Sequence, residues 1–393
     1  MKIAQLAREG DEAYREVLQS LEEKHLTIVR QLISVQSQST VMTFVKVRFK
    51  ELEDLFHGIY LIKENSVRTL DYVASFGERL AAFILAESMQ GHGLKTQFLD
   101  AREVIRTNDR FGQAKVDFDI TNAAIKNYFA KHDGIKVITG FIASTEKGET
   151  TTLGRSGSDY TAAIFAAALN AECLEIWTDV SGVLTSDPKL VYTAFTIPQL
   201  SYNEAMELSH FGAKVIFPAT MQPAMRNSIP IYIKNTFEPE NPGTLINGEV
   251  SPGALIKGIS SIPNVSIVTV QGAGMLDSAV GTSRVFKALA EARVNILLIS
   301  QASSEHSICL AIKTQESYLA KEAVEKEFFY EIKSGEMDEV VLLHDLATVA
   351  VVGENMKHNP GASGRMFRAL GRNNINVGAI AQGSSELNIS AVI

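Results

Sequence analysis

The sequence predicts an α/β protein in which a mainly parallel sheet, flanked by helices, is followed by a duplicated smaller module. Three observations lead to this prediction. Apolar residues at helical spacing run through most of residues 1–130. Residues 135–180 then follow the order strand, glycine-containing turn, helix, strand, which is typical of a βαβ unit. Finally, residues 265–312 and 348–393 are related by an internal repeat.

The predicted elements follow from the period of the apolar residues. Helices are expected at Glu12–Leu32, Val41–Ile62, Val67–Met89, Asp119–Lys131 and Tyr202–Phe211. Strands are expected at Leu94–Leu99, Ile135–Ala143, Cys173–Val180 and Ile229–Lys234. Within the third helix, Ser75 and Glu78 have the S-x-x-E spacing of a capping box, which locally indicates a helix start.

Composition excludes several classes of protein. The hydrophobic content of 46% and the charged content of 21% are those of a globular chain. The net charge of −8 argues against nucleic acid as a partner. No apolar run is long enough to predict a membrane span, and the N-terminus does not read as a signal peptide. Cys173 and Cys309 lie in apolar runs and are expected to be reduced core residues of a cytoplasmic protein.

The stretch Thr150–Tyr160, which contains TTLGRSGSDY, is the strongest candidate for a ligand site. Gly154 and Gly157 permit a close approach of the backbone to a ligand, and the N–H groups of a turn that starts a helix favour phosphate or carboxylate. Arg155 adds a planar fork suited to a carboxylate. The alternative is structural, because Ser156 and Asp159 have the spacing of a capping box. The stretch matches neither a Walker A loop nor G-x-G-x-x-G.

The end of the next predicted strand supplies further candidates. Ligands on parallel sheets bind beyond the carboxyl ends of the strands, and Thr178 and Asp179 lie at such an end. The loop Ser181–Leu190 follows. Proline and glycine in Glu238–Gly253 then indicate a linker.

The repeat has a constant offset of 81 residues, seen for example in Gly272 and Gly353 and in Arg284 and Arg365. Each copy is expected to read strand, helix, strand, strand. The first copy continues through a helix at Gln315–Phe328 and a strand at Glu339–Leu343, whereas the second stops at Ile393. The sequence is therefore expected to lack a C-terminal portion of the second copy.

Together, TTLGRSGSDY, EIWTDVSGVLTSDPK, NEAMELSHFGAKVIFPAT and IYIKNTFEPENPGTLI, in this order before tandem repeats, resemble aspartate kinase. The repeats resemble ACT domains, and their SQASSE and AQGSSE segments are most similar to the kinase half of bifunctional aspartate kinase–homoserine dehydrogenase. The resemblance implies an amino-acid-kinase fold at 1–246, a linker at 247–264, a first ACT (βαββαβ) repeat at 265–346 and an incomplete second repeat at 347–393. Residues 1–246 are expected to lack the family's N-terminal strand.

The implied reaction transfers the γ-phosphoryl group of Mg²⁺-ATP to the β-carboxylate of L-aspartate, the first step of threonine, methionine and lysine biosynthesis. The resemblance assigns Arg155 to the substrate α-carboxylate and gives Glu78 and Asp159 the substrate ammonium. Gly157 and Ser158 would line the aspartate and phosphate region. The residues implied for ATP are Thr178, Asp179, Leu184, Lys189, Lys214 and Val215. No protein ligand to a metal is assigned.

The ACT repeats imply feedback regulation by L-threonine and a homo-oligomer formed through these domains. Gln301 and Gln382 match the family's threonine-recognising glutamines, and a primary amide can bond an amino-acid effector. Asn295 and Asn376 recur at the same offset. The alternative is that all four amides satisfy local backbone groups, since duplicated structure also preserves structural residues.

Three departures from the family pattern qualify the resemblance. The family's K-F-G-G-T-S strand is absent, Leu184 replaces an aromatic residue, and Phe217 replaces a histidine after Lys214. One alternative is therefore a catalytically inactive fragment that acts only as an amino-acid-binding regulatory module. Another is a kinase for a different acid, such as glutamate or an N-acetylated amino acid.

Overall fold

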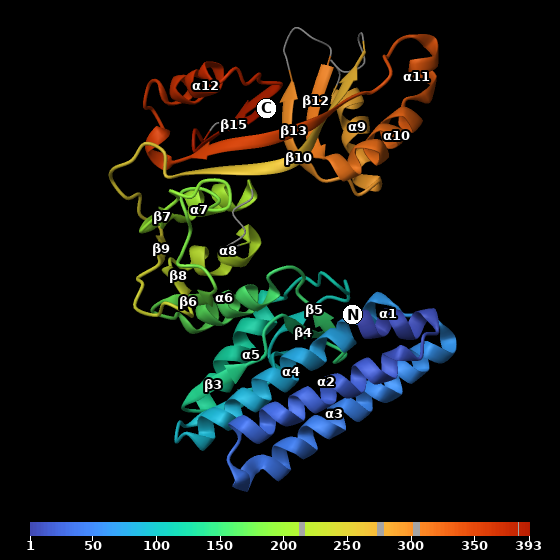
Figure 1. Cartoon of the computed structure of the whole chain (residues 1–393), viewed down its shortest axis with the longest axis vertical. Coiled ribbons are helices and arrows are strands. Elements are labelled where there is room, and N and C mark those ends of the chain that lie inside the picture. The colour runs from blue at the N-terminus through green and yellow to red at the C-terminus, as the bar shows by residue number, and fades with distance from the viewer. Residues whose placement is uncertain (212–216, 273–278, 302–306, 384) are drawn as a thin grey trace. The chain divides into compact units, whose positions relative to one another are not determined.

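The computed structural model in Figure 1 describes residues 1–211, 217–272, 279–301, 307–383 and 385–393. The chain forms two compact units that mix helices and strands. Unit 1 comprises Met1–Leu174 and Ala219–Pro230, and unit 2 comprises Glu175–Pro218 and Ile231–Ile393. No helix within the described ranges is both long and apolar enough to cross a membrane.

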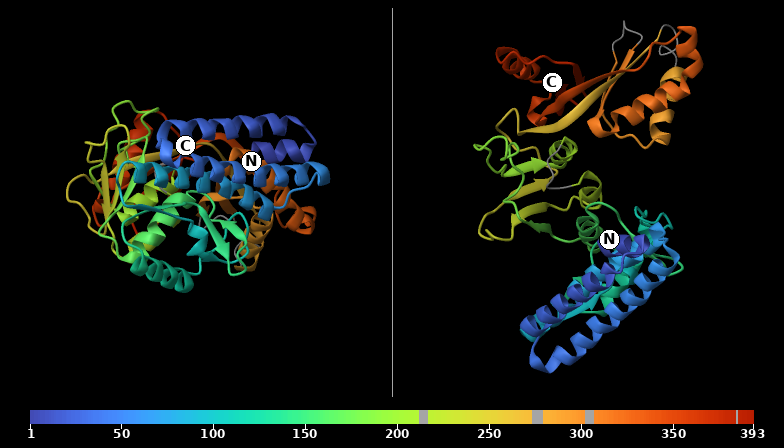
Figure 2. Two further views of the ribbon diagram at one scale, coloured as in Figure 1. Left: turned by 90° about the horizontal axis from the view of Figure 1, so that it is seen from below. Right: turned by 45° about the vertical axis from the view of Figure 1, so that its right-hand side comes forward.

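Unit 1 begins with a short helix and then long helices, which lie side by side in every view (Figures 1 and 2). They are α1 (Lys2–Glu9), α2 (Ala13–Leu32), α3 (Val35–Ile62) and α4 (Val67–Gly91). Their shared core buries Tyr14, Phe56 and Phe76, and the rings of Phe44 and Phe83 stack with centroids 3.9 Å apart. The helices predicted from apolar spacing are confirmed, although α3 begins earlier than expected.

The rest of unit 1 places short strands against helices. The elements are β1 (Thr96–Leu99), η1 (Ala101–Glu103), β2 (Arg106–Thr107), α5 (Phe118–Lys131), β3 (Ile135–Ile138), β4 (Ile142–Thr145), β5 (Thr150–Thr152), α6 (Gly157–Leu169) and α8 (Pro218–Arg226). β1 pairs with β3 in parallel, and β2, β4 and β5 form a separate sheet. The buried residues of this region form a second core that includes Leu99, Ile105, Ile125 and Ile164.

The single strand predicted at Ile135–Ala143 is wrong. The chain leaves β3 at Ile138, turns through Thr139–Phe141 and enters β4 at Ile142 in a different sheet. Phe141 has a φ of 66°, which breaks the extended conformation. The apolar run did not reveal this break because β-branched residues on both sides of it favour a strand.

Unit 2 contains a four-stranded sheet of order β6-β8-β9-β7 and a six-stranded sheet of order β11-β12-β10-β13-β15-β14. The first group of elements is β6 (Leu174–Thr178), β7 (Gln199–Ser201), α7 (Tyr202–His210), β8 (Ile231–Asn235) and β9 (Thr244–Asn247). The second is β10 (Gly258–Gln271), α9 (Ala279–Glu291), β11 (Ile296–Gln301), β12 (Ser307–Lys313), η2 (Thr314–Glu316), α10 (Ser317–Glu327), α11 (Phe329–Ser334), β13 (Val341–Val352), η3 (Glu354–Met356), α12 (Ala362–Arg372), β14 (Ala379–Gln382) and β15 (Asn388–Val392).

The two repeat copies share one sheet through the long antiparallel strands β10 and β13. β10 begins at Gly258, inside the range expected to be a linker, because Gly258–Ile262 pair with Thr348–Val352. β13 joins the expected last strand of the first copy to the first strand of the second. Register shifts around Val265 let this pairing continue across both copies.

Several local predictions are wrong. Ser75 and Glu78 do not form a helix start, because they lie inside α4, where the Ser75 hydroxyl donates to the Tyr72 carbonyl. Cys173 is exposed, and Cys309 is only partly buried. The strand predicted at Cys173–Val180 is β6, but it is not a buried strand: it lies at an edge of its sheet as described, and its Trp177 is 44% exposed.

We expect Asp71→Ala to lower the free energy of unfolding of unit 1 by about 3 kcal/mol. Asp71 is 4% exposed, and its carboxylate accepts hydrogen bonds from the Gly112 N–H at 2.8 Å, the Thr152 N–H at 3.1 Å and the Thr152 hydroxyl at 2.8 Å. Alanine would leave these donors buried without an acceptor. Chemical denaturation followed by far-UV circular dichroism measures the change. Asp54→Ala, at an exposed position of α3, is the control and should leave the midpoint unchanged; equal midpoints for both variants would contradict the prediction.

Candidate active site

The turn at Gly154–Ser158 joins β5 to α6 in a conformation that few residues adopt. Gly154 has a φ of 77° and Ser156 a φ of 53°, both in the left-handed region. Within the described residues the Ser156 side chain makes no capping hydrogen bond, so the capping-box alternative is not realised. α6 begins at Gly157, where an added Cβ would lie 2.7 Å from Phe141 Cδ2. The turn therefore packs directly on the break between β3 and β4.

Gly140, in that break, brings together segments that are far apart in the sequence. A Cβ at Gly140 would lie 2.9 Å from Ser158 Cβ, so only glycine permits this approach. The Gly140 backbone also forms a hydrogen bond to the Glu78 carboxylate. Next to Gly140, the Phe141 N–H donates to Thr161 Oγ1 at 3.0 Å. Glu78 on α4 and the start of α6 therefore meet at one point.

The carboxyl groups of this site lie in a partly dehydrated environment. Burial raises the pKa of Glu78, and the hydrogen bond from Gly140 offsets part of that increase. Burial also raises the pKa of Asp159, in the first turn of α6. Arg155 and Ser158 are exposed in the same turn. Two carboxylates, a guanidinium and the N-terminus of a helix suit a ligand that carries both an ammonium group and carboxylates.

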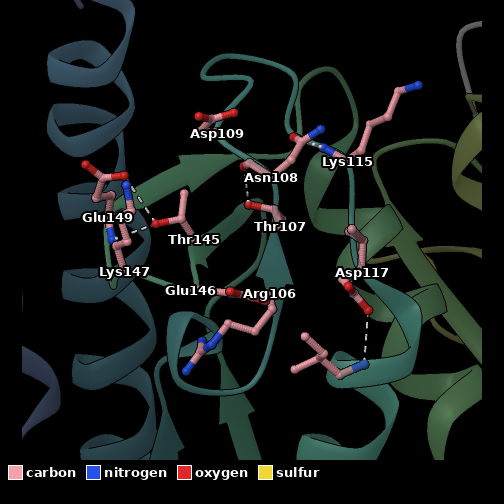
Figure 3. Close-up of a pocket in the computed structure, with 12 residues that line it drawn as sticks. Arg106, Thr107, Asn108, Asp109, Lys115, Asp117, Thr145, Glu146, Lys147 and Glu149 are labelled. Carbon is pink, nitrogen blue, oxygen red and sulfur yellow. Dashed lines mark hydrogen bonds between the residues drawn. The ribbon is translucent and has the colours of Figure 1, made fainter.

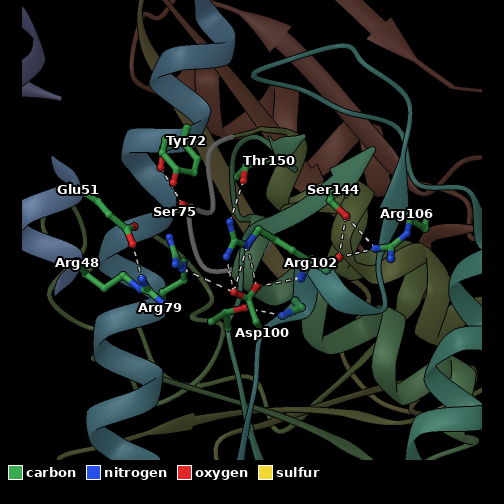
Figure 4. Close-up of polar contacts among 12 residues, drawn as sticks. Arg48, Glu51, Tyr72, Ser75, Arg79, Asp100, Arg102, Arg106, Ser144 and Thr150 are labelled. Atoms are coloured by element: carbon green, nitrogen blue, oxygen red, sulfur yellow. Dashed lines mark hydrogen bonds and ion pairs between the residues drawn. The ribbon is translucent and has the colours of Figure 1, made fainter. Parts of the chain in front are cut away.

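A buried ionic network at the carboxyl end of β1 reaches the first residue of β5 (Figure 4). Arg102 donates to both oxygens of Asp100, with Nε–Oδ1 and Nη2–Oδ2 distances of 2.9 and 2.6 Å, and its Nη1 donates to Thr150 Oγ1 at 2.9 Å. Arg79, the neighbour of Glu78, has its Nε 3.7 Å from Asp100 Oδ2. Burial lowers the pKa of Arg79, and the positive charges of Arg102 and Arg48 add to this effect.

Sequence reasoning missed Asp71, Asp100, Arg102 and Gly140. Asp71 joins α4 to β5 and to the loop at Gly112, and Arg102 ties Asp100 to the first residue of β5. The available signal for Asp71 was a carboxylate on a helix rich in apolar residues. Its role was not apparent, since its partners lie 41 and 81 residues away.

The residues predicted to bind ATP lie in unit 2. Thr178 ends β6, and its hydroxyl donates to Asp179 Oδ1 at 3.1 Å. Leu184 forms an isolated bridge with Thr196. Lys189 is exposed, and its N–H donates to Asp187 Oδ1 at 2.9 Å. Lys214 and Val215 lie outside the described residues.

A separate cavity of about 530 Å³ lies beside β2, β4 and the start of α5 (Figure 3). Charged side chains of both signs surround it, including Arg106, Asp109, Lys115, Asp117 and Glu149. Asp117 caps α5 by accepting the Ile120 N–H at 3.1 Å. None of the predicted site residues that the structure describes lines this cavity, so it is distinct from the site at Gly140.

Among the predicted effector residues, the two glutamines end strands and the two asparagines are exposed. Gln382 ends β14 and lines a cavity of about 430 Å³, together with residues of η3, the loop that follows it, and α12. Gln301 ends β11 at the corresponding position of the first copy, and the residues that follow it, 302–306, are not described. Asn295 and Asn376 are exposed, and the Asn295 N–H donates to Glu316 Oε2 at 2.9 Å.

The sequence matches known families over both parts of the chain. Residues 7–235 match the amino acid kinase family, and residues 268–328 and 349–393 match the ACT domain. The first match includes the turn at Gly154–Ser158, Glu78 and the end of β6. The second includes part or all of each strand of the six-stranded sheet and the residues that line the cavity at Gln382.

Curated relatives of the chain are aspartokinases. The bifunctional aspartokinase/homoserine dehydrogenase of Haemophilus influenzae is 40% identical over 318 residues, covering 81% of this chain and 39% of that protein. Bifunctional aspartokinase/homoserine dehydrogenase 1 of Arabidopsis thaliana is 36% identical over 397 residues, covering 98% and 43%. The chain thus spans less than half the length of these bifunctional relatives. Lysine-sensitive aspartokinase 3 of Escherichia coli is 33% identical over 352 residues, covering 88% and 77%.

Solved structures agree with this assignment. Escherichia coli aspartokinase III in complex with aspartate and ADP, in its R-state, superposes with a TM-score of 0.83 and 30% identity, covering all of this chain and 86% of that one. The same enzyme in complex with lysine and aspartate, in its T-state, gives a TM-score of 0.79. The amino-acid-kinase fold with ACT domains, expected from the sequence, is thereby confirmed. The chain belongs to the amino acid kinase family and, within it, to the aspartokinases.

Proposed function

We propose that the protein is an aspartate kinase, which transfers the γ-phosphoryl group of ATP to the β-carboxylate of L-aspartate. One observation carries this proposal: the Glu78 carboxylate and Ser158, in the turn at Gly154–Ser158 that also holds Arg155, both lie next to Gly140. The similarity to an enzyme solved with aspartate and ADP supports it. Aspartate-dependent formation of ADP by this chain is the direct test. Threonine binding without turnover would instead favour the regulatory module.

The proposed roles follow from charge and shape. Arg155 forms a bidentate pair with the α-carboxylate of aspartate, and Glu78 and Asp159 accept its ammonium group. Gly157 and Ser158 line the region where the two substrates meet. The substrate carboxylate is itself the nucleophile, so catalysis rests on positioning and on neutralising the charge of two anions.

ATP and Mg²⁺ complete the proposed reaction. Thr178, Asp179, Leu184, Lys189, Lys214 and Val215 are the proposed nucleotide residues. Among the described residues, no group of three or more histidine, cysteine or acidic side chains could hold a metal ion. Mg²⁺ is commonly bound through substrate phosphates with one or two carboxylates, so the proposed ion would be held mainly by ATP. The ion would neutralise charge on the transferring phosphoryl group.

We further propose L-threonine as a feedback effector that binds the cavity lined by Gln382, His358, Ser363 and Glu386. An amide and a carboxylate suit the hydroxyl and ammonium groups of the amino acid. We also propose that the ACT domains join chains into a homo-oligomer. The matches of residues 268–328 and 349–393 to the ACT domain support this proposal.

We expect Arg155→Lys to raise the KM for aspartate about tenfold or more, because lysine cannot form a bidentate pair with a carboxylate. Steady-state kinetics with varied aspartate measures the change. Arg30→Lys, at an exposed position of α2, is the matched control and should leave KM unaltered. An unchanged KM in Arg155→Lys would remove Arg155 from the substrate site.

The pH dependence of aspartate use should reflect the raised pKa of Glu78 and Asp159. Binding of the substrate ammonium needs ionised carboxylates, so kcat/KM should rise with pH until both have ionised, above the usual carboxyl pKa of about 4. Glu78→Gln should lower kcat/KM and move the acid limb of the profile to lower pH.

The free energy of unfolding should fall as pH rises, whereas kcat/KM should rise. Because the pKa of Glu78 is raised on folding, the folded chain binds more protons than the unfolded chain, and the free energy of unfolding falls as pH rises through this range. Glu78→Gln should weaken that fall. Unfolding measured across the same pH series provides the check. Identical pH profiles for both proteins would show that Glu78 does not control either property.

We expect Gln382→Ala to raise the Kd for threonine about tenfold, because the cavity would lose an amide that can bond the effector. Isothermal titration calorimetry measures this binding directly, without turnover. Gln90→Ala, at an exposed position of α4, is the control. Unchanged affinity in Gln382→Ala would place the effector elsewhere.

A further inference from the structure

The start of helix α7 holds a carboxylate that makes bonds in two directions. Glu204 and Ser201 form a capping box, in which Ser201 Oγ accepts the Glu204 N–H at 3.1 Å and Glu204 Oε2 accepts the Ser201 N–H at 2.9 Å. Capping needs only one oxygen and works at an exposed helix end. Glu204, however, is fully buried, and its Oε1 accepts the Glu354 N–H at 2.8 Å.

Glu354 belongs to the second repeat copy and begins η3. The chain that follows it, starting with Met356 and His358, lines the cavity of the proposed effector. Its predecessor Gly353 packs closely on the segment that contains Leu255, because an added Cβ at Gly353 would lie 2.4 Å from the Leu255 carbonyl oxygen. A single buried carboxylate thus connects α7 of the amino-acid-kinase region to the first residue of the effector loop.

Other contacts place the same helix on the six-stranded sheet. Asn388 Nδ2, at the start of β15, donates to Glu207 Oε2. The Ser260 hydroxyl of β10 donates to the Leu208 carbonyl oxygen at 3.2 Å. These contacts hold the body of α7, whereas Glu204 holds its N-terminus. In the sequence, Lys214, one of the proposed nucleotide residues, lies four positions after the last residue of α7.

We infer that Glu204 is the positioning residue through which occupancy of the effector cavity acts on helix α7. The inference rests on the proposed effector function. Loss of the Glu354 N–H bond would leave a buried carboxylate oxygen without a donor, which is costly. A released arrangement of the η3 loop would therefore be a separate state of higher energy. An effector that prefers one of the two arrangements changes the position of α7 by its difference in affinity.

Glu354→Pro tests this bond selectively. Proline is tolerated at the first position of a helix, and Gly353 has a ψ of 129°, which suits a residue before proline. The substitution removes the N–H that Glu204 accepts and leaves every kinase-region side chain unchanged. Glu354→Ala is the matched control, because it removes the same side chain and keeps the N–H. Within the described structure, Glu354 Oε2 has no hydrogen-bond partner to lose.

Three readouts with threonine as the probe separate the outcomes. They are threonine binding by calorimetry, hydrogen exchange of residues 202–210 with and without threonine, and the affinity for ADP with and without threonine. In the unaltered chain and in Glu354→Ala, we expect threonine to change the protection of α7 and to shift the ADP affinity by about 5- to 150-fold. In Glu354→Pro, threonine should still bind, while both responses fall toward zero.

Equal threonine responses in Glu354→Pro and Glu354→Ala, with binding retained, would overturn the inference and leave the proposed effector in place. An unaltered chain that does not bind threonine would refute the proposed effector and the inference with it. If Glu354→Pro does not fold, Glu204→Ala replaces it, since alanine accepts neither of the two N–H bonds. This variant should also lose the response, and a full response would contradict the inference.

Discussion

The candidate active site depends on the absence of a side chain at Gly140. The backbone there lies so close to Ser158 that a Cβ would stand 2.9 Å from the serine Cβ. This approach ends β3, turns the chain through Phe141 into β4, and seats the first turn of α6 against the break. The same backbone reaches the Glu78 carboxylate on α4. One close contact therefore sets the distance between a long helix, a strand end and a helix start.

That closeness has an electrostatic consequence. Glu78 and Asp159 are partly removed from water, and burial raises the pKa of both. Their charged forms are then less stable in this site than in water, and the proposed binding of the substrate ammonium group would restore favourable interactions. The electrostatic attraction is also stronger where water is excluded. Under the proposed function, the site would therefore lower the stability of the fold and favour substrate binding, as functional sites commonly do.

The sequence allowed accurate prediction wherever the signal was local and periodic. Helices α2, α4, α5 and α7 follow from apolar spacing to within a few residues. The break at Gly140 could not be predicted, because its cause is a contact with Ser158 from another segment. The same holds for Asp71 and Glu204, whose backbone partners lie as far as 81 and 150 residues away. Glu78 was identified through family resemblance, whereas its local S-x-x-E pattern pointed to a helix start that does not exist.

Asp71 in unit 1 and Glu204 in unit 2 make the same kind of interaction. Each is a buried carboxylate held by backbone N–H groups of separate segments. Such bonds are directional and weaken when one segment moves, so each carboxylate stabilises the arrangement in which both segments are in place.

In unit 2, the contacts with α7 also differ between the two repeat copies. At the offset of 81, Glu354 corresponds to Ala273 and Asn388 to Ser307. Asn388, which bonds α7, is thus replaced by a shorter side chain in the first copy. The chain has two copies of the repeat and a single α7. The two copies therefore do not need to contact α7 in the same way.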